Sequence, residues 1–225
     1  VRAMTPEKRY ALAGTELRDI LTGQASSMGG LFVNDMRIRS WYERYARADP
    51  IVLDGDPDLG LNASQLRAVA MMLRERVSLV QGPPGTGKTR TLVQTVSLLK
   101  QHFQVPHPIL LAAHTNVAVD NLAEGCVRAG LRVVRAGSST AARDSIIPHT
   151  YEAQCQRHAC YASLQEAEKA LRDVQAKRDA VSISLDTSDA VRQQWQRLKR
   201  RATQLTAKCH VLRRRIQADV LHHAD

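Results

Sequence analysis

Hydrophobic positions along the chain follow two different spacings. Three short apolar runs, at residues 77–80, 109–113 and 131–135, alternate with stretches whose apolar residues recur every three or four positions. Short apolar runs are typical of buried strands, and the longer periodic stretches are typical of helices that cross over between parallel strands. The alternation predicts an α/β fold with a parallel sheet that helices cover on both faces.

From about residue 151 the chain shows the helical spacing alone. Two long periodic stretches are separated by the turn residues at 185–189. The simplest arrangement of such stretches is a long antiparallel helical hairpin, with arms roughly 35 to 40 Å long.

The first 60 residues carry weaker signals. Short helices are predicted at 6–12 and 17–21, and a clearer helix at 36–47 contains two tyrosines and a tryptophan among arginines. Such rings can stack on nucleic-acid bases or pack against neighbouring structure, and packing is the favoured alternative.

The motif with the most specific chemistry follows the first apolar run directly. Residues 81–89 read Gln-Gly-Pro-Pro-Gly-Thr-Gly-Lys-Thr, a Gly-x4-Gly-Lys-Thr phosphate loop. Its glycines let the backbone turn tightly with several N–H groups pointing inward at the start of a helix. Lys88 then reaches the β- and γ-phosphates, and the Thr89 hydroxyl completes the shell of a Mg²⁺ ion. The loop predicts a nucleoside triphosphate site.

A second candidate for nucleotide contact opens the helix expected over about residues 61–76. Asn62 and Gln65 have the spacing of a capping box, which gives Gln65 a structural role. Its side-chain amide also donates and accepts at once, as recognition of adenine requires. The predicted nucleotide contacts are Gln65, Gly82, Pro83, Pro84, Gly85, Thr86, Gly87, Lys88, Thr89 and Arg90.

Charge and cysteine content narrow the classes further. The formal net charge of +10 favours polyanionic partners such as nucleic acid. No apolar run is long enough to span a membrane and no signal segment opens the chain, so a soluble intracellular protein, cytoplasmic or nuclear, is expected. The four cysteines are expected to be free thiols. A cluster of Cys155, His158 and Cys160 matches no standard zinc spacing.

The second arm of the expected hairpin is strongly basic. Residues 190–218 contain nine Lys or Arg and no Asp or Glu, whereas the first arm carries both acidic and basic residues. A solvated face, partly neutralised by acids of the first arm, and a phosphate-contacting arm both fit this pattern.

Taken together, these segments resemble the superfamily 1 helicases of the Upf type. Residues 61–65 look like the family's Q motif, and residues 81–89 look like motif I in its double-proline form. Residues 113–122, with Thr115 and Asn116, look like motif Ia, and residues 130–135 are similar to the strand that follows it. The likeness is dense over residues 61–137.

The resemblance implies an incomplete RecA-like P-loop NTPase sheet. The expected parts are an N-terminal helical and linker region (1–60), an ATP-binding core (61–140) and a helical hairpin insertion (141–225). The cofactors would be ATP and Mg²⁺. Thr115 and Asn116 would meet the backbone of single-stranded RNA or DNA, although either residue could equally be an ordinary helix cap. The hairpin could offer a surface to protein partners. The parent protein would be an ATP-dependent helicase that translocates 5′ to 3′.

Part of the machinery for hydrolysis is missing from the sequence. Hydrolysis needs a carboxylate for Mg²⁺, another to orient water and usually an arginine. The family's Asp-Glu pair occurs nowhere in the chain, and Asp54 ends an apolar run on the wrong side of the loop. The alternative is therefore a non-catalytic scaffold that binds nucleic acid or protein and keeps a remnant loop. A small-molecule kinase would not explain Gln65 and Asn116 together.

We expect the isolated chain to bind nucleotide weakly and to hydrolyse essentially none, because Lys88 and Thr89 grip phosphate without those carboxylates. Phosphate release from ATP with Mg²⁺ measures this directly. A helicase-like turnover that the Lys88→Ala variant abolishes would contradict it.

Overall fold

A computed structural model of the chain describes residues 32–138, 141–181 and 188–225. The chain forms two compact units, residues 1–106 and 107–225. The helices expected at 6–12 and 17–21 lie outside the described residues, and so does most of the turn expected at 185–189.

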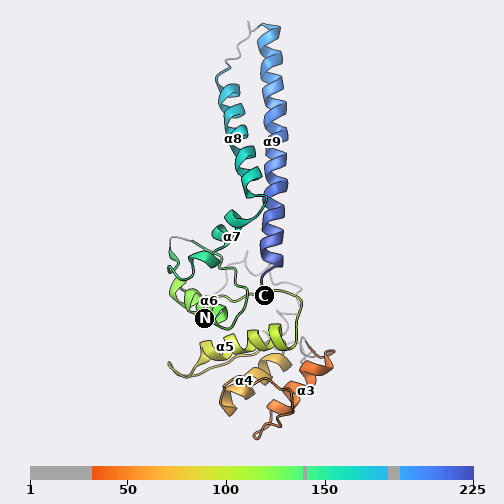
Figure 1. The fold of residues 1–225 in the computed structure, drawn as a ribbon, viewed down its shortest axis with the longest axis vertical. Helices are drawn as coiled ribbons and strands as arrows, with labels where there is room; N and C mark the ends of the chain where they lie inside the picture. The colour runs from red at the N-terminus through yellow and green to blue at the C-terminus, as the bar shows by residue number, and fades with distance from the viewer. Residues whose placement is uncertain (1–31, 139–140, 182–187) are drawn as a thin grey trace, which may run out of the picture. The chain divides into compact units, whose positions relative to one another are not determined.

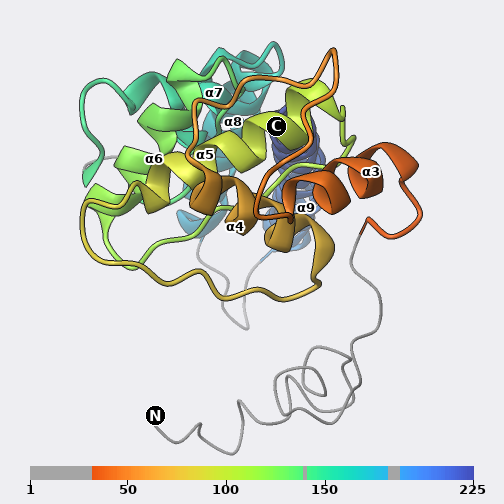
Figure 2. The same cartoon turned by 90° about the horizontal axis from the view of Figure 1, so that it is seen from below.

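The first unit is built on two packed helices, α3 (Met36–Tyr45) and α4 (Ala63–Arg74). Figure 2 shows α3 beside α4, with α5 next to α4. The carboxylate of Asp35 caps α3 by accepting hydrogen bonds from two amides of its first turn. The buried residues of these helices follow the helical spacing: Ile38, Trp41, Tyr42, Tyr45, Val69, Ala70 and Leu73.

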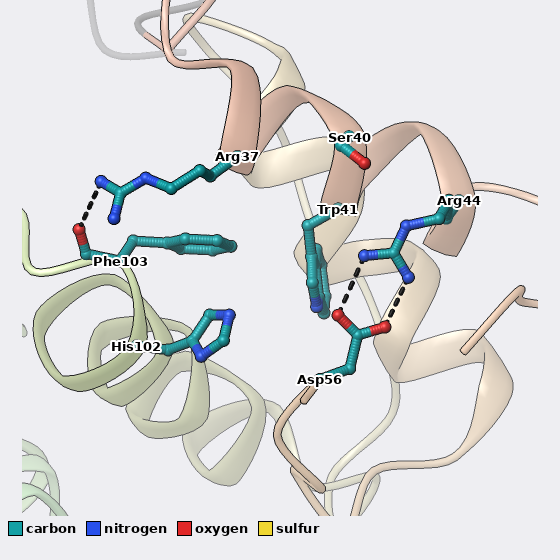
Figure 3. Close-up of a pocket in the computed structure, with 7 residues that line it drawn as sticks. All are labelled: Arg37, Ser40, Trp41, Arg44, Asp56, His102 and Phe103. Atoms are coloured by element: carbon teal, nitrogen blue, oxygen red, sulfur yellow. Dashed lines mark hydrogen bonds and ion pairs between the residues drawn. The ribbon is translucent and has the colours of Figure 1, made fainter. Parts of the chain in front are cut away.

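The aromatic residues of α3 belong to the core of this unit. Trp41 stacks on Tyr45 with ring centroids 4.1 Å apart, and Phe103 meets Trp41 edge-on at 6.5 Å. Trp41 and Phe103 line a pocket of about 310 Å³, together with His102 and Arg37 (Figure 3). Because Trp41 and Tyr45 are buried, the packing alternative for this helix is confirmed.

Asp56 anchors the linker between α3 and α4. Its carboxylate accepts two hydrogen bonds from the Arg44 guanidinium, one from the Tyr45 hydroxyl at 3.2 Å and one from the Leu53 amide at 2.8 Å. The side chains of Arg44 and Asp56 are 15% and 7% exposed. The hydrogen bonds from Arg44 hold the pKa of Asp56 below its ordinary value of 3.8.

Helix α5 (Lys88–Ser97) starts at the phosphate loop and runs into a π-helical turn, η1 (Leu98–His102). Val93, Val96, Leu98 and Leu99 are buried along this stretch. The loop is therefore attached to a helix that is fixed by its apolar face.

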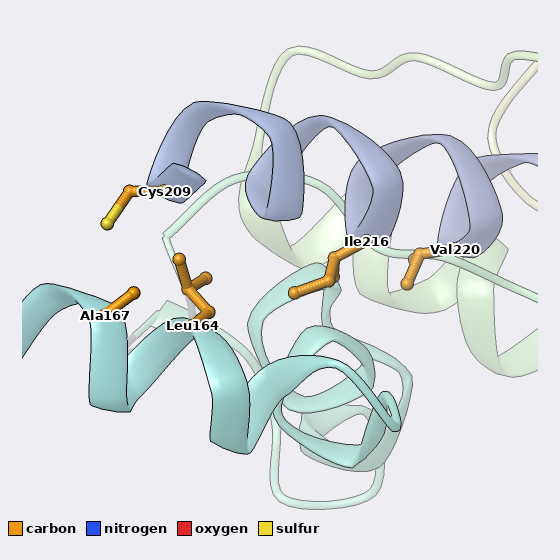
Figure 4. Packing of buried hydrophobic residues seen from close by; sticks show 5 residues of the cluster. All are labelled: Leu164, Ala167, Cys209, Ile216 and Val220. Atoms are coloured by element: carbon orange, nitrogen blue, oxygen red, sulfur yellow. The ribbon is translucent and has the colours of Figure 1, made fainter. Parts of the chain in front are cut away.

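The second unit contains α6 (Asn116–Arg128), the short 3₁₀ turn η3 (Ile147–His149) and α7 (Tyr151–Arg157). It continues with α8 (Tyr161–Asp179) and α9 (Asp189–His222), which lie side by side in opposite directions (Figure 1). Their contact with each other and with α7 is apolar, and the buried residues drawn in Figure 4 are Leu164, Ala167, Cys209, Ile216 and Val220.

The two arms of this helical pair differ in length. Helix α8 has 19 residues and α9 has 34, which correspond to about 28 and 51 Å at the standard rise per residue. The expectation of two arms of 35 to 40 Å was therefore wrong for both helices.

The expected parallel sheet is not present in residues 32–138, 141–181 and 188–225, which contain helices and no strand. The prediction of an α/β RecA-like core was thus wrong for this part of the chain. The three apolar runs that suggested strands do not pair with one another. Leu79 and Leu110, which lie inside two of them, are 87% and 91% exposed.

The third run shows why no ladder forms. Arg135 makes a single parallel bridge with Thr150. The backbone N–H of Arg135 donates to the His149 carbonyl at 2.8 Å, and the backbone N–H of Tyr151 donates to the Arg135 carbonyl at 2.9 Å. Thr150 is already the cap of α7, so the partner segment turns into a helix after one residue. A strand needs successive pairs along a neighbour, and apolar spacing alone does not provide that neighbour.

None of the helices in the described ranges combines the length and the apolar character needed to cross a membrane.

Replacing Asp56 by Asn should destabilise the first unit by about 2 kcal/mol, because charge-assisted hydrogen bonds to Arg44 are lost. The pKa of Asp56 is lowered in the folded state, so its contribution is present above pH 3.8 and is lost as the pH falls through the lower folded pKa. Urea unfolding at pH 7 and at pH 3 measures both effects. We expect the difference between wild type and variant to shrink at pH 3; an unchanged difference would contradict the assignment.

Candidate functional site

The phosphate loop presents an open helix start to solvent. Gly85 and Gly87 have φ angles of 79° and 81°, which L side chains rarely adopt. Gly87 is the N-cap of α5 and provides no side-chain cap. The first N–H groups of the helix are therefore left to an external acceptor, which is the arrangement that binds phosphate.

Lys88 lies folded across the loop. Its Nζ donates hydrogen bonds to the carbonyl oxygens of Gly82 at 2.8 Å and Pro83 at 2.7 Å. The Thr86 hydroxyl donates to the same Pro83 carbonyl at 2.8 Å, and a Cβ added at Gly82 would lie 2.9 Å from that hydroxyl oxygen. The ammonium group is thus positioned over the loop, where an anion could take over its hydrogen bonds.

Gln65 connects the start of α4 to this loop. Its Oε1 accepts from the Asn62 amide at 3.0 Å, and Asn62 Oδ1 accepts from the Gln65 amide at 3.0 Å, so the predicted capping box is confirmed. Its Nε2 donates to the Thr86 carbonyl at 3.0 Å. A Cβ added at Gly87 would lie 2.8 Å from Nε2, so the glycine permits this approach.

The remaining loop residues follow the same helix. Thr89 is exposed in the first turn of α5. Arg90, next to it, donates from its Nη2 to the Gly60 carbonyl at 2.8 Å. The first unit thus brings Gln65 and every predicted residue of the loop into one region, with donors that fit a triphosphate and a hydroxyl that fits Mg²⁺.

The second unit holds Thr115 and Asn116 at the start of α6. Thr115 is the N-cap, and its hydroxyl accepts from the Ala118 amide at 3.2 Å, which is the ordinary capping role. Asn116 Oδ1 accepts from Arg135 Nη2 at 3.2 Å. The amide group of Asn116 therefore has a fixed direction.

A buried ion pair behind Asn116 was missed by sequence reasoning. Arg135 Nε donates to Asp120 Oδ1 at 3.2 Å, and the two side chains are 1% and 2% exposed. The second carboxylate oxygen of Asp120 accepts from the Arg143 amide at 3.1 Å. Two signals were available: Asp120 lies one helical turn after Asn116, and Arg135 is a charge inside an apolar run.

The cysteine and histidine cluster has its own internal partners. His158 Nε2 hydrogen bonds to Asp219 Oδ2 at 3.1 Å, and its Nδ1 accepts from the Cys160 amide at 3.1 Å. All four cysteines are free thiols. In the described parts of the chain, no group of His, Cys, Asp and Glu is arranged to hold a metal ion.

Comparison with known proteins places this chain in a family. The family model described as AAA domain matches residues 60–225, which include the capping box, the phosphate loop, α6 and the helical pair.

Individual relatives match shorter segments. The chain is 48% identical over 84 residues to the ATP-dependent helicase upf1 of Schizosaccharomyces pombe, covering 36% of the chain and 9% of that protein. It is 49% identical over 75 residues to the regulator of nonsense transcripts 1 homolog of Arabidopsis thaliana, covering 33% and 6%. It is 32% identical over 125 residues to an uncharacterized ATP-dependent helicase of Methanocaldococcus jannaschii, covering 54% and 19%.

The matched segments therefore span less than a fifth of the length of these curated relatives. The chain belongs to the AAA domain family, as a member of the Upf-type superfamily 1 helicases.

Proposed function

We propose that this chain binds ATP with Mg²⁺ through the phosphate loop, as the nucleotide-binding part of an ATP-dependent motor on single-stranded RNA or DNA. The observation that carries the proposal is the uncapped start of α5 with Lys88 held across it. The relatives named as ATP-dependent helicases support it. In this proposal, hydrolysis and 5′ to 3′ translocation belong to the whole protein.

The loop residues have distinct parts in nucleotide binding. The free amides at the start of α5 donate hydrogen bonds to the phosphate oxygens, and Lys88 exchanges the Gly82 and Pro83 carbonyls for the β- and γ-phosphates. Thr89 is placed in the first turn to offer its hydroxyl to Mg²⁺. The metal ion, when bound, neutralises charge on the β- and γ-phosphates.

Gln65 retains capacity for adenine. The capping box and the loop use one lone pair of its Oε1 and one proton of its Nε2. A side-chain amide has a second lone pair and a second proton. Gln65 can therefore contact adenine while it still holds the loop to the cap of α4.

Asn116 is our candidate contact to the nucleic-acid backbone. Since Arg135 occupies its Oδ1, the amide protons of Asn116 are the groups left for an acceptor. Phosphate oxygens are acceptors only, and contacts of this kind position a strand without reading its sequence. The buried pair of Arg135 with Asp120 keeps the group aimed.

Nucleotide binding is tested with the Lys88→Ala variant and a matched control, Lys169→Ala, on the exposed surface of α8. Loss of a charge-assisted contact should raise the dissociation constant for ATP with Mg²⁺ at least about tenfold in the first variant and leave the control unchanged. Titration calorimetry measures both. Absence of binding in the wild type, or equal affinity in Lys88→Ala, would instead support the scaffold alternative.

The nucleic-acid contact is tested with Asn116→Asp. The new carboxylate still accepts from Arg135 but has no proton to donate and repels phosphate. We expect affinity for a single-stranded oligonucleotide, measured by fluorescence anisotropy, to fall roughly tenfold or more.

The control is Asn121→Asp, which makes the same change at an exposed position of the same helix. An equal loss in both variants would show that only net charge matters. No loss in either would remove Asn116 from the interface.

A further inference from the structure

Helix α9 carries more basic charge than its neighbours neutralise. Its nine Lys and Arg residues lie between positions 192 and 215, and no Asp or Glu occurs from residue 190 to residue 218. One face of α9 is occupied by the apolar contact with α8 and α7, which includes Cys209, Ile216 and Val220. The charges are distributed around the rest of the helix.

Six of these cations form two rows. At about 100° per residue, Arg197, Arg201 and Lys208 fall within about 40° of one another on one flank of the apolar face, where Arg215 also lies but has Asp219 as its partner at 3.9 Å. Arg192, Lys199 and Arg213 fall within about 60° on the opposite side. We call the first set the unpaired row and the second the paired row.

Members of the paired row have partners within the chain. Arg213 Nη2 contacts Glu168 Oε1 of α8 at 2.7 Å. The ammonium group of Lys199 lies 5.2 Å from the ring centroid of Trp195. Arg192 also has an interaction with another group of the chain. Each cation of this row thus has a contact within the chain.

Members of the unpaired row have no such partner in the described residues. Arg197, Arg201 and Lys208 are exposed, and within the described ranges none of them forms an ion pair, a side-chain hydrogen bond or a ring contact. Two acids that contact α9 residues have other partners: Glu168 pairs with Arg213, and Asp219 contacts His158 and Arg215. Three cations held on one rigid helix therefore face solvent together.

The spacing of the row suits a regular polyanion. Separations of four and seven residues place its charges about 6 and 10 Å apart along the helix axis. Each strand of a duplex presents a phosphate about every 3.4 Å of axis, so the row matches every second or third phosphate.

The surroundings argue against a protein partner. Protein interfaces are anchored by buried aromatic and apolar side chains. No Phe, Tyr or Trp follows Trp195 in α9, and Gln204 lies between Arg201 and Lys208 on the same side.

We propose that the unpaired row of Arg197, Arg201 and Lys208 binds the phosphate backbone of nucleic acid. The row consists of other residues than the phosphate loop and Asn116, and so it goes beyond the proposed nucleotide and strand contacts. Its binding is electrostatic and independent of base sequence. It does not require bound nucleotide.

The test compares two triple variants of the chain. One replaces the unpaired row (Arg197→Gln, Arg201→Gln, Lys208→Gln), and the control replaces the paired row (Arg192→Gln, Lys199→Gln, Arg213→Gln). Both remove three charges from the same helix. Circular dichroism checks that both fold, and binding is measured without nucleotide over a series of salt concentrations.

Two probes, a single-stranded oligonucleotide and a duplex, distinguish the form of nucleic acid. We expect the unpaired-row variant to lose about tenfold or more in affinity near 0.1 M salt. Its slope of log affinity against log salt should flatten by about 2 for the single strand, or nearly 3 for the duplex, according to which probe the row engages. The paired-row variant should retain most of the affinity and most of the salt slope.

Three results would overturn the proposal: equal losses in the two variants, no loss in either, or an equal loss of binding to poly-glutamate, which would indicate an acidic protein partner. Affinity for ATP should not change in the unpaired-row variant, and Lys88→Ala should keep the salt slope. The two proposals therefore fail independently.

Discussion

The side-chain amide of Gln65 is the interaction on which the candidate nucleotide site depends. It accepts from the Asn62 amide and donates to the Thr86 carbonyl, so one residue both closes the start of α4 and fixes the middle of the phosphate loop. Gly87 has no side chain to obstruct this contact, and α5 begins at the next residue. The loop is thus held from a helix cap on one side and from an apolar helix on the other.

The buried charges of the described residues have partners of opposite sign in each unit. Arg44 with Asp56, and Arg135 with Asp120, are buried and surrounded by further hydrogen bonds, as the cost of an isolated buried ion requires. The second pair fixes the side-chain amide of Asn116, whereas Lys88 and the unpaired row of α9 are exposed.

Local patterns predicted the helix caps around the candidate site better than they predicted the fold. The capping box, the glycines of the loop and the cap at Thr115 depend on residues a few positions apart, so the sequence was sufficient to identify them. The three apolar runs were read as strands, but a strand depends on a distant neighbour, and Leu79 and Leu110 have none covering them. The pairing of Arg135 with Asp120 was missed because it joins positions 15 residues apart, although the placement of each charge was visible in the sequence.

Nuclear magnetic resonance tests the central claim, that the open start of α5 is where phosphate binds. In an isotope-labelled chain titrated with ATP and Mg²⁺, we expect the largest shifts at the backbone amides of Gly85, Gly87 and Lys88, since these groups gain acceptors. Smaller shifts should follow at Thr86 and Gln65. Unchanged loop amides at saturating nucleotide, with shifts confined to other residues, would contradict the account.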